Sequence, residues 1–168
     1  MLAAPPDFLA LLNEYQPLLR RVCRMYCAAA DDRQDLYQEI VAQLWRAWPR
    51  YQPRPDVKPS TWLYRVALNV AISDLRQRTR RPTPTHLDAA QLPDMPLPPV
   101  DGPDTDDLHL LYRAINRLSD VDKAFVLLYL EERTYEEMAD ILGITQNNVR
   151  VKMHRVQEKL RQLLTQPT

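Results

Sequence analysis

The chain contains little glycine or cysteine, no long apolar run and no excess of either charge. Only 2 glycines and 2 cysteines occur among its 168 residues. Few segments alternate between apolar and polar residues, so we expect an all-α protein. A membrane-spanning helix needs about 20 consecutive apolar residues, and the sequence has neither such a run nor the pattern of a signal peptide. These absences predict a cytosolic, cytoplasmic protein without membrane insertion.

The residue types that bind metals do not form a recognisable site. Cys23 and Cys27 lie one helical turn apart on a predicted helix, but no further cysteine or histidine lies near enough to complete a set of ligands. We interpret them as buried or half-buried thiols. His86, His109 and His154 are scattered, and no nucleophile–base arrangement or phosphate-binding loop is present. The sequence therefore predicts no metal, no cofactor and no enzymatic activity.

The distribution of charge is informative although the net charge is zero. Residues 65–81 contain five arginines and one acid, and residues 146–161 contain five lysines or arginines and one acid. Between them, residues 82–107 contain seven prolines, six aspartates and no lysine or arginine. Basic segments are typical of nucleic-acid contacts, whereas a Pro/Asp-rich segment cannot bury enough apolar surface to order itself. We therefore predict two small helical domains, 1–81 and 108–168, joined by a flexible linker.

The segment 134–164 has the pattern of a helix-turn-helix. Gly143 permits the positive φ of a tight turn, Thr145 is a good N-cap, and the small Ala139 lets the two helices approach closely. One side of the second helix is apolar, at Val149, Met153, Val156, Leu160, Leu163 and Leu164. With helices expected over 108–118 and, after Ser119, to about residue 131, the segment makes a four-helix domain. Its last helix would lie in a DNA major groove.

The face of this last helix opposite the apolar stripe carries the side chains expected to contact duplex DNA. Asparagine can read adenine, and an exposed valine can touch a thymine methyl group. The alternative is an ordinary amphipathic helix with a solvated basic face. The candidate DNA contacts are Gln146, Asn147, Asn148, Arg150, Val151, Lys152, His154 and Arg155.

The N-terminal half predicts three helices in a bundle. The first runs from Pro5 and Pro6 to about residue 29, and the second follows Asp31 and Asp32, which can cap it. The third, residues 62–80, is apolar on nearly all sides and should therefore be central. Its one polar stripe consists of Trp62, Arg65, Asn69, Ser73, Arg76 and Arg80. An aromatic ring with arginines suits single-stranded nucleic acid, although a solvated arginine face with a half-buried tryptophan would look the same.

Two segments of this half resemble bacterial RNA polymerase sigma factors of the extracytoplasmic-function type. DRQDLYQEIVAQLWRAW, residues 32–48, resembles the sigma region 2 helix that docks on the β′ clamp helices of the polymerase. PSTWLYRVALNVAISDLRQRTRR, residues 59–81, matches the family pattern at Trp62, Leu63, Arg65, Ala67, Asn69, Asp74 and Arg76. The helix-turn-helix resembles sigma region 4, so the resemblance covers nearly the whole chain.

The resemblance implies a two-domain factor that directs promoter-specific transcription initiation. Region 2 would recognise and melt the minus-ten element, and region 4 would bind the minus-thirty-five duplex. Implied partners are the core polymerase (β′ clamp helices and β subunit), promoter DNA and a cognate anti-sigma factor. The implied polymerase contacts are Asp35, Leu36, Gln38, Glu39 and Trp45. The implied minus-ten contacts are Lys58, Ser60, Trp62, Arg65, Asn69, Arg76 and Arg80.

Two other functional classes fit parts of the sequence. A free-standing helix-turn-helix regulator with a ligand-sensing N-terminal domain would need the last helix but not the stripe that contains Arg65, Asn69 and Arg76. A helical adaptor that has lost DNA binding would need neither the Gly143 turn nor the basic helix after it. The stripe therefore favours the initiation factor over the free-standing regulator, and the Gly143 turn with its basic helix favours it over the adaptor.

Overall fold

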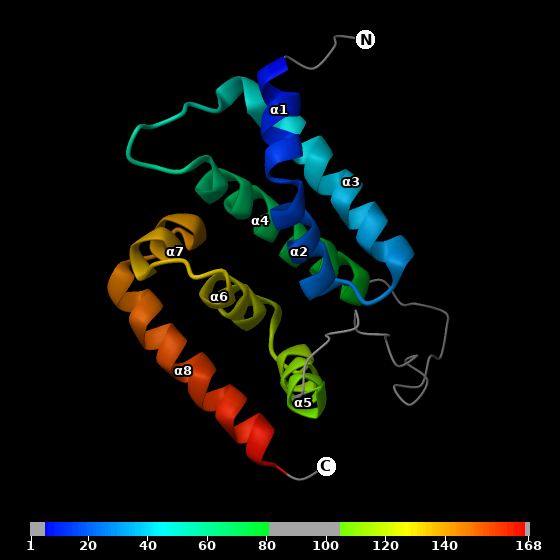
Figure 1. Cartoon of the computed structure of the whole chain (residues 1–168), viewed down its shortest axis with the longest axis vertical. Helices are drawn as coiled ribbons and strands as arrows, with labels where there is room; N and C mark the ends of the chain where they lie inside the picture. The colour runs from blue at the N-terminus through cyan, green and yellow to red at the C-terminus, as the bar shows by residue number, and fades with distance from the viewer. Residues whose placement is uncertain (1–5, 81–104, 167–168) are drawn as a thin grey trace.

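The computed structural model describes residues 6–80 and 105–166, and within these ranges the chain is helical (Figure 1). No strand occurs in them, apart from an isolated bridge between Arg54 and Val57. The all-α prediction is thus confirmed. The elements are α1 (Pro6–Glu14), α2 (Gln16–Tyr26), α3 (Ala30–Ala47), the 3₁₀ turn η1 (Trp48–Arg50), α4 (Pro59–Arg80), α5 (Thr105–Asn116), α6 (Asp120–Leu130), α7 (Tyr135–Leu142) and α8 (Gln146–Thr165).

The single first helix predicted up to about residue 29 is wrong, because the chain forms two helices that meet at Tyr15. Pro17 stands at the start of α2. A proline has no amide hydrogen and its ring obstructs the preceding turn, so it is tolerated at a helix start but not in the interior. The turn is closed by hydrogen bonds from Tyr15 N to Leu11 O (3.1 Å) and from Leu19 N to Tyr15 O (3.2 Å).

Three other predicted helix starts are shifted. The N-cap of α3 is Ala29, and Asp31 and Asp32 lie inside its first turn. There their negative charge interacts favourably with the positive end of the helix dipole. Helix α4 begins at Pro59 instead of at residue 62, which fits the preference of proline for the first helical position. Likewise α5 begins at Thr105, within the segment predicted as linker; most of that linker lies outside the described residues.

Helix α4 is the centre of the molecule. It packs against α2 and α3 on one side and against α6 and α7 on the other, and Figure 1 shows it between the two groups. Its buried apolar side chains, among those that the structure describes, are Leu63, Tyr64, Ala67, Leu68 and Ala71. Because α4 contacts helices of both groups, the predicted central position of this helix is confirmed.

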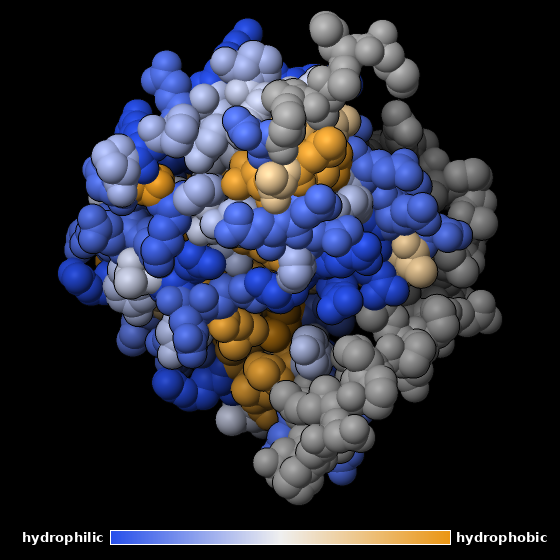
Figure 2. Space-filling model, turned by 45° about the horizontal axis from the view of Figure 1, so that its top comes forward, coloured by the Kyte–Doolittle hydropathy of each residue, from blue (hydrophilic) through white to orange (hydrophobic). Residues whose placement is uncertain are grey.

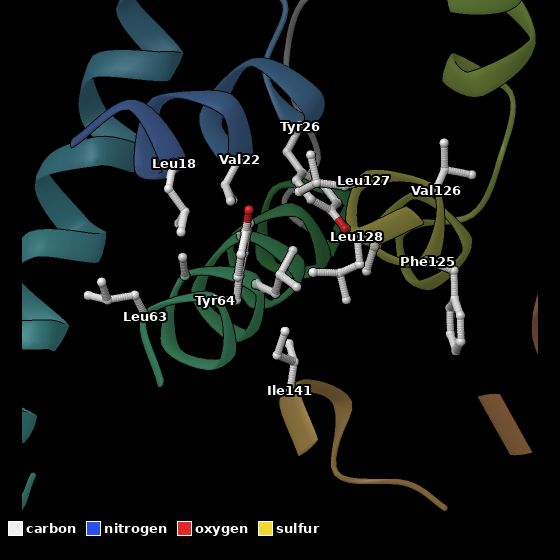
Figure 3. Close-up of a cluster of buried hydrophobic side chains, with 14 of the residues drawn as sticks. Leu18, Val22, Tyr26, Leu63, Tyr64, Phe125, Val126, Leu127, Leu128 and Ile141 are labelled. Atoms are coloured by element: carbon white, nitrogen blue, oxygen red, sulfur yellow. The ribbon is translucent and has the colours of Figure 1, made fainter. Parts of the chain in front are cut away.

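The two domains share one core across this helix. Figure 3 shows Tyr64 of α4 among Val22 of α2, Leu128 of α6 and Ile141 of α7. All four side chains are at most 3% exposed. Burial of apolar surface stabilises by about 25 cal/mol per Å², so the apolar side chains of both domains favour this packed arrangement.

The second domain contains the predicted helix-turn-helix, formed by α7 and α8. Gly143 ends α7 with a φ of 69°, which is the positive φ predicted for this turn. Thr134 and Glu137 form a reciprocal capping box at the start of α7, and the Oγ1 of Thr145 accepts a hydrogen bond from Asn148 N at the start of α8 (3.2 Å). These caps satisfy backbone N–H groups that a helix start leaves free, so the turn geometry is fixed locally.

Helix α8 is tied to α6 by a buried carboxylate. The side chain of Asp122 is 2% exposed and forms ion pairs with Lys159 (2.9 Å) and Lys152 (3.1 Å). Burial acts to raise the pKa of Asp122, but hydrogen bonds from Lys159 and Lys152 outweigh it and hold the pKa below its ordinary value of 3.8. The charge of Asp122 is therefore compensated where it is buried, as a buried charge requires.

The exterior is mainly hydrophilic on the face seen in Figure 2, with local patches of hydrophobic side chains. Exposed large apolar side chains include Trp45, Tyr129, Leu130 and Val151. Among residues 6–80 and 105–166, no helix combines the length and apolar character that crossing a bilayer would require.

Replacing Gly143 tests the turn between α7 and α8. A Cβ there would meet no atom within 4 Å, so any cost arises from the left-handed backbone alone. We expect Gly143→Ala to lower the free energy of unfolding by about 1 kcal/mol. Asparagine tolerates this conformation better, so Gly143→Asn should cost less. Urea denaturation measures both, and equal losses would show that the φ of residue 143 is not the cause.

Replacing Asp122 tests the tie between α6 and α8. We expect Asp122→Asn to lower the free energy of unfolding by about 2 kcal/mol near neutral pH, because two lysines lose a buried partner. Since the folded-state pKa is lowered, this contribution is fully present above pH 3.8 and is lost as pH falls through the folded-state value. Urea midpoints across this range should therefore converge for the two proteins. The exposed Asp107→Asn is the control, and a difference that stayed constant with pH would contradict the role of the charge.

Candidate nucleic-acid interface

The predicted face for duplex DNA lies on α8 and is largely open. Gln146, Asn147, Asn148, Arg150, Val151, His154 and Arg155 are all exposed. Val151 is 44% exposed although it is apolar, which leaves its methyl groups available for contact with a thymine methyl group. Lys152 differs, since its ammonium group is engaged by Asp122 at 3.1 Å. A contact between Lys152 and DNA would have to share or break this ion pair.

The predicted stripe on α4 is partly covered by aromatic rings. Trp62 stacks on Tyr51, with ring centroids 4.4 Å apart and planes at 29°. Trp48 also stacks on Tyr51, with ring centroids 5.4 Å apart. Phe8 of α1 meets Trp48 edge-on at 5.3 Å. Trp62 is therefore the half-buried end of an aromatic cluster. Sequence analysis missed Tyr51 as part of this surface, although its place in the proline-broken loop before Trp62 was visible.

Three further residues of the stripe and its approach contact the second domain. The ammonium group of Lys58 pairs with Glu137 at 2.9 Å. The hydroxyl of Ser60 accepts a hydrogen bond from Arg133 Nη1 at 3.1 Å. The guanidinium group of Arg65 donates to the backbone carbonyl of Asp140. The structure thus brings these three residues to α7 and to the turn before it.

The remaining predicted residues of this surface are not engaged in the same way. Asn69 is exposed on α4, on the part of the helix beyond Arg65. The side chains of Arg76 and Arg80 lie outside the described ones. Their contacts with DNA stay predictions.

Glu131, at the end of α6, is a residue of this region that sequence analysis missed. It pairs with Arg21 at 2.6 Å and accepts a hydrogen bond from the Tyr64 hydroxyl at 3.0 Å. The Arg133 guanidinium lies 5.2 Å from the centroid of the Tyr64 ring. Burial, and then the negative charge of Glu131, raise the pKa of Tyr64 to about 12, so its phenol stays protonated and can donate. No local sequence pattern pairs residues this far apart.

Glu137 combines a local and a long-range role. Its carboxylate accepts a hydrogen bond from Thr134 N at 3.0 Å, which caps α7, and it also pairs with Lys58. Burial acts to raise the pKa of Glu137, but the hydrogen bonds from Lys58 and Thr134 hold it below its ordinary value. The carboxylate is therefore charged at neutral pH and ties the two domains together.

The predicted polymerase-binding helix is α3. Asp35, Gln38 and Glu39 are exposed on it, and Trp45 is partly exposed where its ring meets Phe8 at 5.2 Å. Leu36 is buried in the core, so its side chain packs beneath this face and is not exposed to a partner. Of these side chains, the exposed edge of an aromatic ring is the one typical of protein interfaces.

The two cysteines lie in the core and not at either interface. Cys23 and Cys27 are both buried, which agrees with their interpretation as buried or half-buried thiols. Burial, and then the proximity of Cys27, raise the pKa of Cys23 to about 11. A thiol with a raised pKa is a poor nucleophile and metal ligand, so the pair acts as packing side chains.

Comparison with known families agrees with the geometry of both domains. Residues 11–81 match the Sigma-70 region 2 family, and residues 108–160 match the family described as Sigma-70, region 4. The RNA polymerase sigma factor CarQ of Myxococcus xanthus is 32% identical over 136 residues, which cover 78% of this chain and 74% of that protein. The ECF RNA polymerase sigma-E factor of Escherichia coli K12 is 28% identical over 163 residues, 91% of this chain and 84% of that protein.

A third relative matches only in part. The ECF RNA polymerase sigma factor SigG of Mycobacterium tuberculosis is 33% identical over 81 residues, which are 48% of this chain but only 21% of that longer protein. The chain therefore spans about a fifth of the length of this relative.

Solved structures show the same fold. The sigma factor RpoE of Bartonella quintana, solved in complex with the anti-sigma factor NepR, superposes with a TM-score of 0.72 at 22% identity and covers 98% of this chain and 100% of that one. CnrH, solved in complex with the cytosolic domain of CnrY, gives a TM-score of 0.63, also at 22% identity, over 94% of this chain and 86% of that one. Family, relatives and fold agree, and the chain belongs to the extracytoplasmic-function (ECF) sigma factors of RNA polymerase.

Proposed function

We propose that this chain binds core RNA polymerase and directs promoter-specific transcription initiation. The observation that carries the proposal is the presence of both sigma regions in one chain, over residues 11–81 and 108–160. Region 2 recognises and melts the minus-ten element, region 4 binds the minus-thirty-five duplex, and the chain itself catalyses no reaction.

Helix α8 is suited to the duplex. Its exposed N-terminal half carries asparagines, arginines and Val151, the side-chain types that read base edges and thymine methyl groups in a major groove. Arg150 and Arg155 add charge for phosphates, which makes the affinity dependent on salt. The helix-turn-helix geometry, with Gly143 in the left-handed conformation, presents these side chains together.

Helix α4 and the preceding loop are suited to a melted strand. The ring of Trp62 and its partner Tyr51 form a stacking surface, and Lys58 and Arg65 supply positive charge beside it. Stacking of a base on an aromatic ring contributes about 1 to 3 kcal/mol, which offsets the few kcal/mol that extruding a base from the duplex costs. Asn69, Arg76 and Arg80 extend this surface along the helix.

Polymerase binding is assigned to α3, through Asp35, Gln38, Glu39 and Trp45, with Leu36 beneath them. The partners are the β′ clamp helices and the β subunit. Exposed apolar side chains such as Tyr129 and Leu130 at the end of α6 fit a chain that works inside a larger assembly.

Run-off transcription with purified core polymerase tests the proposal. The template is the region upstream of the chain's own gene. We expect a discrete transcript that depends on this protein, with Arg155→Ala and Asn69→Ala each reducing it by about tenfold or more. Arg155→Ala should weaken binding to the duplex promoter. Asn69→Ala should leave that binding unchanged and slow promoter melting, which is measured by the permanganate reactivity of unpaired thymines.

Matched controls separate these effects from loss of charge or stability. Arg113→Ala removes an exposed arginine of α5, and Asn13→Ala removes an exposed asparagine of α1; both should leave the transcript unchanged. A missing transcript together with a footprint on duplex DNA without polymerase would contradict the proposal and indicate a free-standing helix-turn-helix regulator.

We further propose an anti-sigma factor as a partner. Both solved relatives were captured with a bound protein, NepR for RpoE and the cytosolic domain of CnrY for CnrH. Affinity capture of the tagged chain from unstressed cells of its source organism, read by mass spectrometry, should return a second protein besides polymerase subunits. Recovery of polymerase subunits alone would contradict this part of the proposal.

A further inference from the structure

All three tryptophans of the chain lie in one aromatic cluster. We define this cluster as Phe8, Trp45, Trp48, Tyr51 and Trp62. Its rings come from four places in the fold: α1, the end of α3, the η1 turn with the residue after it, and the start of α4. Trp62 belongs to the surface proposed for the melted strand, and Trp45 to the face proposed for polymerase. The cluster therefore joins the two proposed surfaces of region 2.

The rings of this cluster follow one another from Phe8 to Trp62. Phe8 meets Trp48 edge-on, with ring centroids 5.3 Å apart. Trp48 stacks on Tyr51 at 5.4 Å, and Tyr51 stacks on Trp62 at 4.4 Å. Trp48 also lies 6.2 Å from Trp62, with the two planes at 54°. Edge-to-face and offset-stacked rings attract one another in these arrangements, so the orientation of each ring depends on its neighbour.

Phe8 is the most deeply buried member of the cluster. It is 3% exposed, whereas Trp45 is 37% exposed and the other three rings are half-buried. It contacts two tryptophans edge-on at once, with centroids at 5.2 Å from Trp45 and 5.3 Å from Trp48. Because buried side chains are closely packed, a ring in this position leaves its neighbours few other orientations. Phe8 thus restricts the ring that supports Tyr51.

Helix α1 packs on the elements that carry these rings. Its apolar side chains, which recur at helical spacing and pack in or against the core, are Phe8, Leu11, Leu12 and Tyr15. Tyr15 lies close to Tyr51, because burial and then the proximity of Tyr15 raise the pKa of Tyr51. Figure 1 shows α1 beside the end of α3, where the loop to α4 begins. The apolar face of α1 therefore supports the aromatic cluster.

An effect of Phe8 on DNA must pass through the rings that it contacts. At 3% exposure its own ring is not accessible to a base or to polymerase. A base stacks on an aromatic ring, and a ring that is already held in its binding orientation loses less conformational entropy when the base arrives. Neighbours that order Trp62 therefore strengthen its stacking without touching the DNA.

We propose that Phe8 is a positioning residue for the stacking rings of Tyr51 and Trp62. Phe8 holds Trp48, Trp48 holds Tyr51, and Tyr51 holds Trp62 in the orientation in which it meets a base of the melted strand. This rests on the proposed function, since it concerns the surface of region 2 assigned to that strand. It adds α1 to the elements that build this surface.

Replacement of Phe8 by leucine tests the proposal, because leucine stays apolar but has no ring. The matched control is the same replacement at the other phenylalanine of the chain, Phe125. Phe125 is 2% exposed and lies on α6, outside the cluster (Figure 3). Both variants lose a buried ring, but only Phe8→Leu removes a member of the cluster. Phe8→Met serves for the same comparisons if Phe8→Leu loses its helical far-UV circular dichroism, since methionine fills irregular space better.

Tryptophan fluorescence of the full chain measures the order of the cluster directly, because every tryptophan belongs to it. We expect Phe8→Leu to shift the emission to longer wavelength, since loosened rings gain contact with water. Phe125→Leu should keep the emission of the wild type, and both variants should keep the far-UV circular dichroism of the wild type.

Promoter melting measures the consequence for function. The probe is 2-aminopurine placed in the non-template strand of the minus-ten element, on a promoter that the chain transcribes. Core polymerase is saturating, so that a change in polymerase affinity through Trp45 does not enter. We expect Phe8→Leu to slow melting about five- to tenfold, with unchanged binding to duplex promoter DNA. Phe125→Leu should melt the promoter at the rate of the wild type.

A double-mutant cycle tests the route from Phe8 to Trp62. In a Tyr51→Leu chain the row of rings is already broken. Adding Phe8→Leu to this chain should therefore slow melting by less than about a further twofold, because residues that act through one another are not additive.

The contrary outcomes are distinct. Unchanged tryptophan emission in Phe8→Leu would show that Phe8 does not order the cluster. Altered emission with a wild-type melting rate, equal slowing by Phe125→Leu, or effects of Phe8→Leu and Tyr51→Leu that multiply would each overturn the positioning role while the proposed function stands. Absence of any transcript with the wild type and with Phe125→Leu would overturn the proposed function itself, and this inference with it.

Discussion

The apolar surface of α4 is the constraint on which the rest of the structure depends. Leu63, Tyr64, Ala67, Leu68 and Ala71 lie on one broad face of the helix and are all buried. The helices α2 and α3 cover only part of it, and α6 and α7 cover the remainder. Exposed apolar surface is unfavourable in water, so the second domain packs against the first even though a long segment separates them in the sequence.

This packing brings function and stability into competition. The start of α4 carries the side chains proposed to bind a melted strand, and several of the same side chains contact the second domain in the free chain. Lys58, Ser60 and Arg65 find hydrogen-bond acceptors or donors on α7 and its approach. A surface that binds a polyanion is complementary to carboxylates, and Glu137 provides one close at hand.

Helix α8 of the second domain differs from the start of α4 in this respect. The face of α8 proposed to bind duplex DNA is exposed, while Asp122 forms ion pairs with Lys152 and Lys159 that hold them towards α6. These lysines thus help hold α8 on its own domain, and the freely exposed cations of its N-terminal half are Arg150 and Arg155. Rigid placement of a recognition helix favours selective binding, because less ordering is needed when DNA arrives.

By itself the sequence determined the helices, the turn and the family. Apolar spacing marked α3, α4 and α8, Gly143 and Thr145 marked the helix-turn-helix, and residues 59–81 carried the family pattern, because these features depend on neighbours within a few residues. The break at Tyr15 was missed, since the apolar pattern continues across it. Only the tertiary structure decided that Glu131 meets Arg21 and Tyr64, and that Ser60 is buried with a hydrogen bond from Arg133. Such pairs join residues far apart in the chain, and no local rule of spacing specifies them.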